Sequence, residues 1–169
     1  MPPHPTETSA AQDSFEALLR AHGGILRKVA STYCRNAADR EDLTQEIATH
    51  WWRSYPRYDG RCAFSTWAYR IALNVAISHV RRESIRLRDT VPAEDHHFEM
   101  ASEDPRPSEE LILLQRFIEG LGDLDKALIL LYLDGHSHQE IAEVLGITAG
   151  HAATKIGRLK ARLRQSSPR

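Results

Sequence analysis

The chain has 169 residues, of which 27% are charged and 7% aromatic, and its net charge is −1. These values are ordinary for a globular protein in water. A near-neutral total excludes a uniformly basic nucleic-acid binder, so any surface for nucleic acid must be local. No apolar run approaches the roughly 20 residues that a membrane-spanning helix needs.

Residues 1–13 have neither a basic start nor an apolar core, so they do not resemble a signal peptide, and we expect a disordered lead. Cys34 and Cys62 are too few and too isolated for a disulfide framework or a cysteine metal site. The histidines have no cysteine or acid at metal-ligand spacing. We therefore expect a cytoplasmic protein that holds no metal and no other cofactor.

Apolar residues at helical spacing predict about four helical segments over residues 14–88. Gly23 and Gly24 interrupt the first of these patterns, and we expect a break or kink there. A further amphipathic helix is predicted over about 40–54. After a loop that contains proline and glycine, we expect Ser65 to cap a long helix.

Composition changes abruptly after this helix. Residues 89–110 contain eight acids and one arginine, with three prolines and no helical periodicity. Such a segment is typical of a flexible linker. We place the acidic linker at 89–108, between a domain over 14–88 and a domain over 109–169. Because no stretch alternates as a strand would, the expected fold class is all-α, with two small helical domains.

The second domain is predicted to contain four helices. Ser108 and Asp123 are the expected N-caps of the first two, and Gly135 ends the second. The segment that follows, 137–163, reads as two helices joined by a tight turn.

The capping signals in this segment agree with one another. Ser137 and Glu140 form a capping box, Gly146 suits the left-handed residue that ends a helix, and Thr148 can cap the next helix. This order predicts a helix-turn-helix, whose second helix enters the major groove of DNA.

The charge of the last helix agrees with this prediction. From residue 148 to the end there are six Lys or Arg and no acid, and Lys155, Arg158 and Arg162 share one helical face. Such a stripe can neutralise phosphates, and its arginines can read guanine. The alternative is a solvated basic helix without a ligand. The capping signals in register with the stripe favour DNA binding.

Three stretches, in this order, resemble a known family. They are DREDLTQEI at 39–47, RYDGRCAFSTWAYRIALN at 57–74, and the helix-turn-helix introduced by LGDLDKALILLYLDGHS at 121–137. Over residues 15–164 the chain resembles the extracytoplasmic-function (ECF) sigma factors of bacterial RNA polymerase, in the sigma-70 family. The resemblance implies a promoter-specificity subunit without enzymatic activity. Its implied partners are the polymerase core, promoter DNA and an anti-sigma factor.

The resemblance also implies a core-docking face made of Asp42, Gln45, Glu46 and Trp52. In the family, this face docks on the coiled coil of the largest polymerase subunit. The spacing is compatible with a polar patch around an aromatic anchor, as at interface hot spots. An alternative is that the acids only complement the dipole of their helix.

The loop and helix that follow resemble the part that opens the −10 promoter element. Aromatic faces can stack on unpaired bases, and arginines can follow the backbone. Phe64 and Trp67 are equally open to being core residues. The residues implied to contact the −10 element are Arg61, Phe64, Trp67, Tyr69, Arg70, Asn74, Arg81 and Arg82.

The helix-turn-helix resembles the part that reads the −35 promoter element. Lys155 stands where the family usually has Arg, and a lysine lacks the bidentate fork of a guanidinium. The residues implied to contact this element are Thr148, His151, Thr154, Lys155, Arg158 and Arg162.

Two other classes of protein fit parts of the pattern. A helix-turn-helix repressor or activator with a helical N-terminal domain would need a dimer interface, and no heptad seam is apparent. A helical adaptor that binds only protein would have no use for the acid-free basic helix at the C-terminal end.

Overall fold

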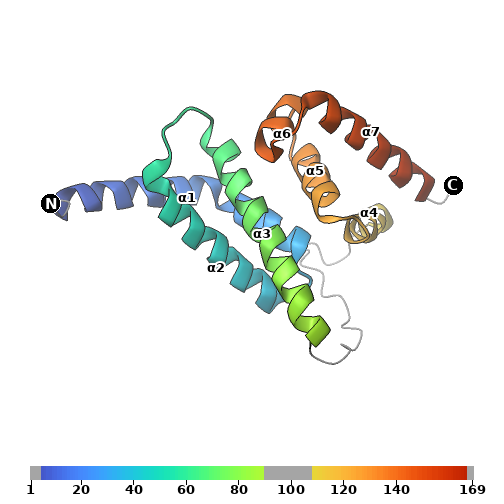
Figure 1. Cartoon of the computed structure of the whole chain (residues 1–169), viewed down its shortest axis with the longest axis horizontal. Helices are drawn as coiled ribbons and strands as arrows, with labels where there is room; N and C mark the ends of the chain where they lie inside the picture. Colours follow the sequence, from blue (N-terminus) through green and yellow to red (C-terminus); the bar gives the residue numbers. More distant parts are fainter. Residues whose placement is uncertain (1–4, 90–107, 167–169) are drawn as a thin grey trace.

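The structure, a computed structural model, describes residues 5–89 and 108–166. Within these two ranges all regular structure is helical, which confirms the all-α fold class, and no helix there could cross a membrane. The elements are α1 (Pro5–Tyr33), α2 (Ala37–Ser54), the short 3-10 helix η1 (Tyr55–Arg57), α3 (Phe64–Asp89), α4 (Glu109–Glu119), α5 (Asp123–Leu133), α6 (His138–Leu145) and α7 (Ala149–Ser166) (Figure 1).

The N-terminal half consists of α1, α2 and α3, which pack against one another. Along α2, Leu43, Ile47 and Trp51 lie one turn apart and are buried, as helical periodicity requires of a core-facing stripe. The Trp51 indole donates a hydrogen bond to the carbonyl of Ala68 at 3.1 Å. This bond gives the buried indole N–H a partner and joins α2 to α3. It therefore helps to fix the orientation of the solvent faces of the two helices relative to each other.

The C-terminal half consists of α4 to α7, with α5 at its centre. Leu128 and Leu131 on α5 are fully buried, as are Ile141 on α6 and Ile156 and Leu159 on α7, to within 3% exposure. A short helix that is apolar on most of its faces must be surrounded by others. The arrangement leaves the opposite face of α7 turned to solvent.

The predicted helix-turn-helix is confirmed in its local geometry. The Ser137 hydroxyl accepts from the Glu140 amide at 3.2 Å, and the Glu140 carboxylate accepts from the Ser137 amide at 2.7 Å. Gly146 has φ of +67°, a conformation that costs little only for glycine. Thr148 Oγ1 accepts from the amide of His151 at 3.1 Å and caps α7. These caps fix where α6 ends and α7 begins.

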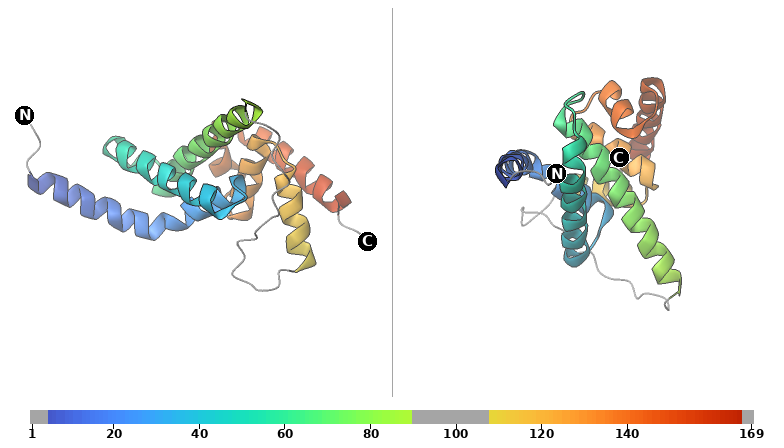
Figure 2. Two further views of the ribbon diagram at one scale, coloured as in Figure 1. Left: turned by 90° about the horizontal axis from the view of Figure 1, so that it is seen from below. Right: turned by 60° about the vertical axis from the view of Figure 1, so that its left-hand side comes forward.

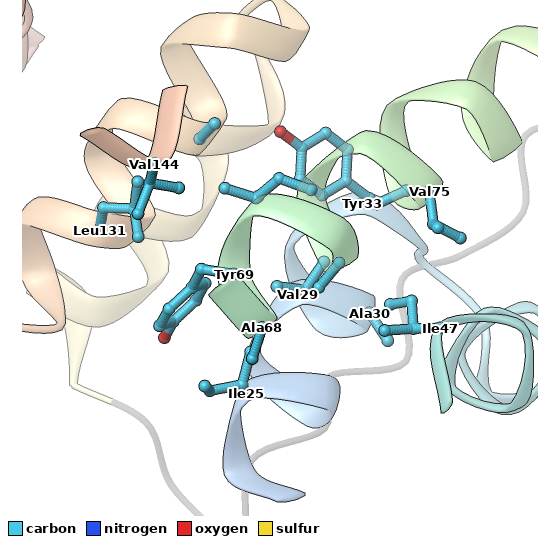
Figure 3. Close-up of a cluster of buried hydrophobic side chains, with 14 of the residues drawn as sticks. Ile25, Val29, Ala30, Tyr33, Ile47, Ala68, Tyr69, Val75, Leu131 and Val144 are labelled. Atoms are coloured by element: carbon cyan, nitrogen blue, oxygen red, sulfur yellow. The ribbon is translucent and has the colours of Figure 1, made fainter. Parts of the chain in front are cut away.

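The two halves are not separate bodies in this structure, because their interiors join into one cluster of buried apolar side chains. Figure 3 shows Ile25 and Tyr69 of the N-terminal half in the same cluster as Leu131 and Val144 of the C-terminal half. The views in Figures 1 and 2 agree that α5 and α6 lie alongside α3, and α1 contacts α5. This packing decides which sequence-predicted residues face solvent.

Some local expectations were wrong. The chain is already helical from Pro5, where a disordered lead over 1–13 was expected; residues 1–4 lie outside the described ranges. The helix α1 continues through Gly23 and Gly24, so the expected break does not occur there, while the alternative of a kink stays a prediction. Its packing against α2 and α3 outweighs the roughly 1 kcal/mol per residue that glycine costs in a helix interior.

Two predicted caps also differ. Ser65 lies inside the first turn of α3, which begins one residue earlier. The N-cap of α5 is Gly122, and Asp123 is the first helical residue. Ser108 caps α4 as predicted, accepting from the amide of Leu111 at 3.3 Å. Most of the predicted acidic linker, residues 90–107, lies outside the described residues.

Candidate DNA-binding and protein-docking surfaces

The solvent face of α7 carries most of the residues predicted to contact the −35 element. Thr148, His151, Thr154, Arg158 and Arg162 are all exposed. Their spacing of three and four residues places them along one side of the helix, opposite the buried Ile and Leu positions. The face is therefore polar, basic and accessible, as a helix that enters the major groove must be.

Lys155 is placed differently from its neighbours on this stripe. Its ammonium donates to Asp125 of α5 at 2.8 Å, and the two side chains are only 32% and 24% exposed. A cation that is already paired neutralises less phosphate charge. The positive charge of the face therefore rests mainly on Arg158 and Arg162, which are both exposed. The Arg162 guanidinium lies 5.8 Å from the centroid of the Phe117 ring on α4.

Three of the four predicted core-docking residues share the solvent face of α2. Asp42 and Gln45 are exposed, and Trp52 is 43% exposed although its size would favour burial. The Trp52 ring meets the ring of Phe15 edge-on, with centroids 5.1 Å apart. Trp52 therefore packs on Phe15 with part of its ring while the rest is open to solvent, as is typical of an aromatic anchor in a protein interface.

Glu46, the fourth, points away from this face. Its carboxylate accepts from Arg82 at 2.6 Å and lies 3.0 Å from Nδ1 of His79, both on α3. Burial alone would raise the pKa of the Glu46 carboxyl, but the hydrogen bonds from Arg82 and His79 hold that pKa below its ordinary value. Glu46 and Arg82, predicted to meet two different partners, are paired with each other.

Phe64 lies at the centre of an aromatic cluster. The ring is 7% exposed, and ring centroids of Trp51, Tyr58, Trp67 and His22 lie between 4.9 and 5.8 Å away. Of the two interpretations left open for Phe64, its burial favours core packing and conflicts with stacking on a base. Trp67 is half-buried, so part of its ring remains available.

Arg61 and Asn74 face solvent. Arg61 lies in the loop before α3 and pairs with Asp59 at 2.9 Å, an exposed ion pair that contributes little to stability. Asn74 is exposed midway along α3. Both side chains remain accessible, as a DNA contact would require.

Tyr69, Arg70 and Arg81 are turned to the C-terminal half. Tyr69 is 1% exposed, and its hydroxyl donates to Asp134 at 2.5 Å. Arg70 donates to the backbone carbonyl of Glu143 at 2.9 Å. Burial raises the pKa of the Tyr69 hydroxyl, and the Asp134 carboxylate raises it further. In this arrangement the C-terminal half therefore covers Tyr69, and its contact with the −10 element stays a prediction.

The residues that receive these side chains were missed by sequence reasoning. Arg81 pairs with Asp123 at 3.5 Å, and Lys28 of α1 pairs with Asp134 at a sequence separation of 106 residues. Partners so far apart leave no periodic signal. The one local sign was an acid at the C-terminal end of α5, where the helix dipole disfavours negative charge.

A hollow of about 210 Å³ lies where α1, α4 and α5 meet, and Cys34 is in its wall. Burial, and next the charge of Asp39, raise the pKa of the Cys34 thiol to about 11. The thiol therefore stays protonated and unreactive near neutral pH. No three His, Cys, Asp or Glu side chains among the described residues gather as a metal site would require.

A helix-turn-helix with an exposed basic face, on an all-helical scaffold, defines a DNA-binding protein. The family models of Sigma-70 region 2 and Sigma-70 region 4 match residues 18–85 and 111–163. The ECF RNA polymerase sigma-E factor of Escherichia coli K12 is 33% identical over 161 residues, 88% of this chain and 84% of that protein. The chain belongs to the ECF sigma factors of the sigma-70 family, and it is an RNA polymerase sigma factor for promoter recognition.

Other relatives agree. The ECF sigma factor SigE of Mycolicibacterium smegmatis is 32% identical over 94% of this chain, which spans 63% of that relative's length. The structure of the sigma factor RpoE of Bartonella quintana, in complex with the anti-sigma factor NepR, covers 90% of this chain and 96% of its own with a TM-score of 0.74. Its identity of 21% means that it shows the fold alone. Sigma factors are generally DNA-recognition proteins rather than catalysts.

Proposed function

We propose that three surfaces divide the work of promoter recognition in this chain. The exposed face of α7, in a domain over 109–169, reads the −35 element. The loop before α3 and the exposed side of α3, in a domain over 14–88, contact and open the −10 element. The solvent face of α2, with Asp42, Gln45 and Trp52, docks on core polymerase.

The observation that carries the proposal is the face of α7. Its exposed residues lie on the second helix of a helix-turn-helix whose caps and turn are in place, and both Arg158 and Arg162 are exposed. Arginine forms bidentate hydrogen bonds with guanine in the major groove. A basic helix of this kind without a DNA ligand would need neither the fixed turn nor the clustering on one side.

The test uses transcription from a linear promoter by purified core polymerase with the full chain. Initiation should depend on the chain, which neither a repressor nor an adaptor would produce. Arg158→Ala should cost ~1–3 kcal/mol of promoter affinity, by an amount that varies with the −35 sequence.

Arg164→Ala is the matched control, because Arg164 is an exposed arginine on another side of α7. It removes the same charge and should cost less, evenly across sequences. Equal, sequence-blind losses for Arg158→Ala and Arg164→Ala would reduce α7 to a phosphate clamp. Lys155→Ala should weaken binding least of the basic residues on this face, because Lys155 already pairs with Asp125.

The proposal includes an anti-sigma factor as partner. The solved RpoE structure holds one, NepR, and the CnrH structure, which matches this chain with a TM-score of 0.67, holds the cytosolic domain of CnrY. Action on core polymerase places the protein in the cytoplasm. Co-expressing the product of the neighbouring gene should lower transcription that depends on this chain if that product is the inhibitor.

A further inference from the structure

Polar contacts bind the two halves of the chain around their shared apolar cluster. In each of them the donor lies in the N-terminal half and the acceptor lies in the C-terminal half. The pairs are Lys28 with Asp134, Tyr33 with the carbonyl of Asp123 at 2.7 Å, Tyr69 with Asp134 at 2.5 Å, Arg70 with the carbonyl of Glu143 at 2.9 Å, and Arg81 with Asp123 at 3.5 Å.

Asp134 is the centre of this set. Its Oδ1 accepts from Lys28 of α1 and its Oδ2 accepts from Tyr69 of α3, so one carboxylate holds two elements of the other half. The side chain is 22% exposed. His136, in the same turn as Asp134, packs its ring edge-on against Tyr69 with centroids 5.2 Å apart.

Local helix energetics do not explain an acid at this position. Asp134 is the C-cap of α5, and the C-terminal end of a helix carries partial negative charge that disfavours a carboxylate. The favourable contacts of Asp134 are therefore those that it makes with Lys28 and Tyr69. Nε2 of His136, in the same half, also lies 3.6 Å from Oδ2 of Asp134. An acid that is unfavourable for its own helix, and whose two hydrogen bonds come from the other half, belongs to the interface.

The chain between the halves is long enough to let them separate. Residues 90–107 connect α3 to the cap of α4, and a segment of that length reaches roughly 60 Å when fully extended. The halves are therefore held together by the interface itself. Interfaces between domains of one chain resemble transient protein–protein interfaces, and relative motion is expected unless they are large and apolar.

The interface uses three residues that the family resemblance assigns to the −10 element. Tyr69, Arg70 and Arg81 contact the C-terminal half, and α6 packs against the first turns of α3 (Figure 1). Of the three, only Tyr69 is buried, because the Arg81 side chain remains 71% exposed. A tyrosine that is 1% exposed cannot meet a base until the cover is removed.

We propose that Asp134, with Lys28 and Tyr69, forms a latch that holds the free chain closed, so that single-stranded promoter DNA and the C-terminal half compete for α3. The competition rests on the proposed function of α3, whereas the latch does not. Removing the latch should raise the fraction of open chains while both halves keep their helices.

The first measurement is the distance between the halves in the full chain. Spin labels on cysteines introduced at the exposed positions Ser84 of α3 and Ser166 of α7, with Cys34 and Cys62 replaced, report it by pulsed electron resonance. Asp134→Ala should convert a narrow distribution into a broad, longer one, raising the ratio of open to closed chains about tenfold.

Two further variants make the result specific. Lys28→Met removes the cation while keeping a long side chain, and its position on α1 lies outside all three proposed binding surfaces. It should open the chain in the same direction as Asp134→Ala. Glu16→Ala is the control, because the partners of Glu16, Gln12 and Arg20, lie one turn away on its own helix, and it should leave the distance unchanged.

The second measurement is binding of a labelled single-stranded 20-mer of random sequence, without polymerase. Asp134→Ala and Lys28→Met should bind it several-fold more tightly than the wild type, whereas Glu16→Ala should not. Helical content measured by circular dichroism should be the same for all variants.

The outcomes separate the latch from the proposed function. Unchanged distances in both Asp134→Ala and Lys28→Met would overturn the latch. Longer distances without tighter DNA binding would overturn the competition for α3. Transcription with core polymerase by the wild type tests the proposed function independently, so its failure would leave the distance measurement standing.

Discussion

Phe64 and Trp67 lie one turn apart on the same side of α3, and the difference between them is how much of each ring water can reach. Phe64 is surrounded by four rings, whereas Trp67 lies at the edge of the cluster and is half-buried. A buried ring contributes packing, while a partly exposed ring can also stack on an unpaired base. Their roles should therefore separate on mutation.

Phe64→Ala should lower the free energy of unfolding by ~3–5 kcal/mol, because it leaves a cavity in the core. Trp67→Ala should cost less stability and slow open-complex formation. A promoter with a pre-melted bubble should restore its activity, since a base–aromatic contact is worth only ~1–3 kcal/mol. Thermal melting beside transcription on both templates measures this. A Trp67→Ala chain as unstable as Phe64→Ala, and inactive on the bubble, would contradict a role in melting.

The Glu46 carboxyl should make the stability of the fold depend on pH. Its folded-state pKa is lowered by Arg82 and His79, so its contribution to stability is complete above the unfolded pKa of about 4.3 and is lost as pH falls through the lower folded value. Glu46→Gln should remove this contribution. Urea unfolding from pH 3 to 7 should show a stability difference between wild type and Glu46→Gln that shrinks toward pH 3. A difference that is constant with pH would show that the Glu46 carboxylate is not the group concerned.

At the scale of elements, α2 presents a docking surface that can be tested without disturbing the core. Gln45→Ala combined with Trp52→Ala should weaken binding to core polymerase by ~2 kcal/mol or more, as loss of an interface anchor does. Thermal melting should change little, because both residues are exposed. His50→Ala, exposed on another side of α2, is the control. Unchanged affinity of the double variant for core would show that this face docks elsewhere or not at all.

The helix-turn-helix could be predicted from sequence because its determinants are local. Ser137 and Glu140 are three residues apart, and Gly146 needs only its own backbone conformation. The partners of Tyr69 and Glu46 could not be predicted, since they lie 65 and 33 residues away in sequence. Along α3, Asn74 is exposed as expected. Tyr69 is covered by a part of the chain that is far away in sequence, so the residues around Tyr69 could not indicate its burial.

At the scale of the whole molecule, the buried cluster runs through both halves, so each half depends on the other for part of its interior. Residues 108–169 alone should melt at a lower temperature than the full chain, because contacts such as those of Tyr33 and Tyr69 are lost. Circular dichroism melts of the fragment and of the full chain measure this. Equal melting temperatures would show that contact between the halves adds no stability.

Two of the contacts between the halves end on main-chain carbonyls, those of Asp123 and Glu143. A carbonyl is present at every position whatever the side chain. A chimaera that joins α1–α3 of this chain to α4–α7 of a relative can therefore keep the bonds from Tyr33 and Arg70 without matched substitutions. The bonds to Asp134 survive only where the donor relative supplies an acid at that position. Recombination between relatives would thus keep the arrangement of the two halves, whereas the residue at position 134 would set the strength of the contact between them.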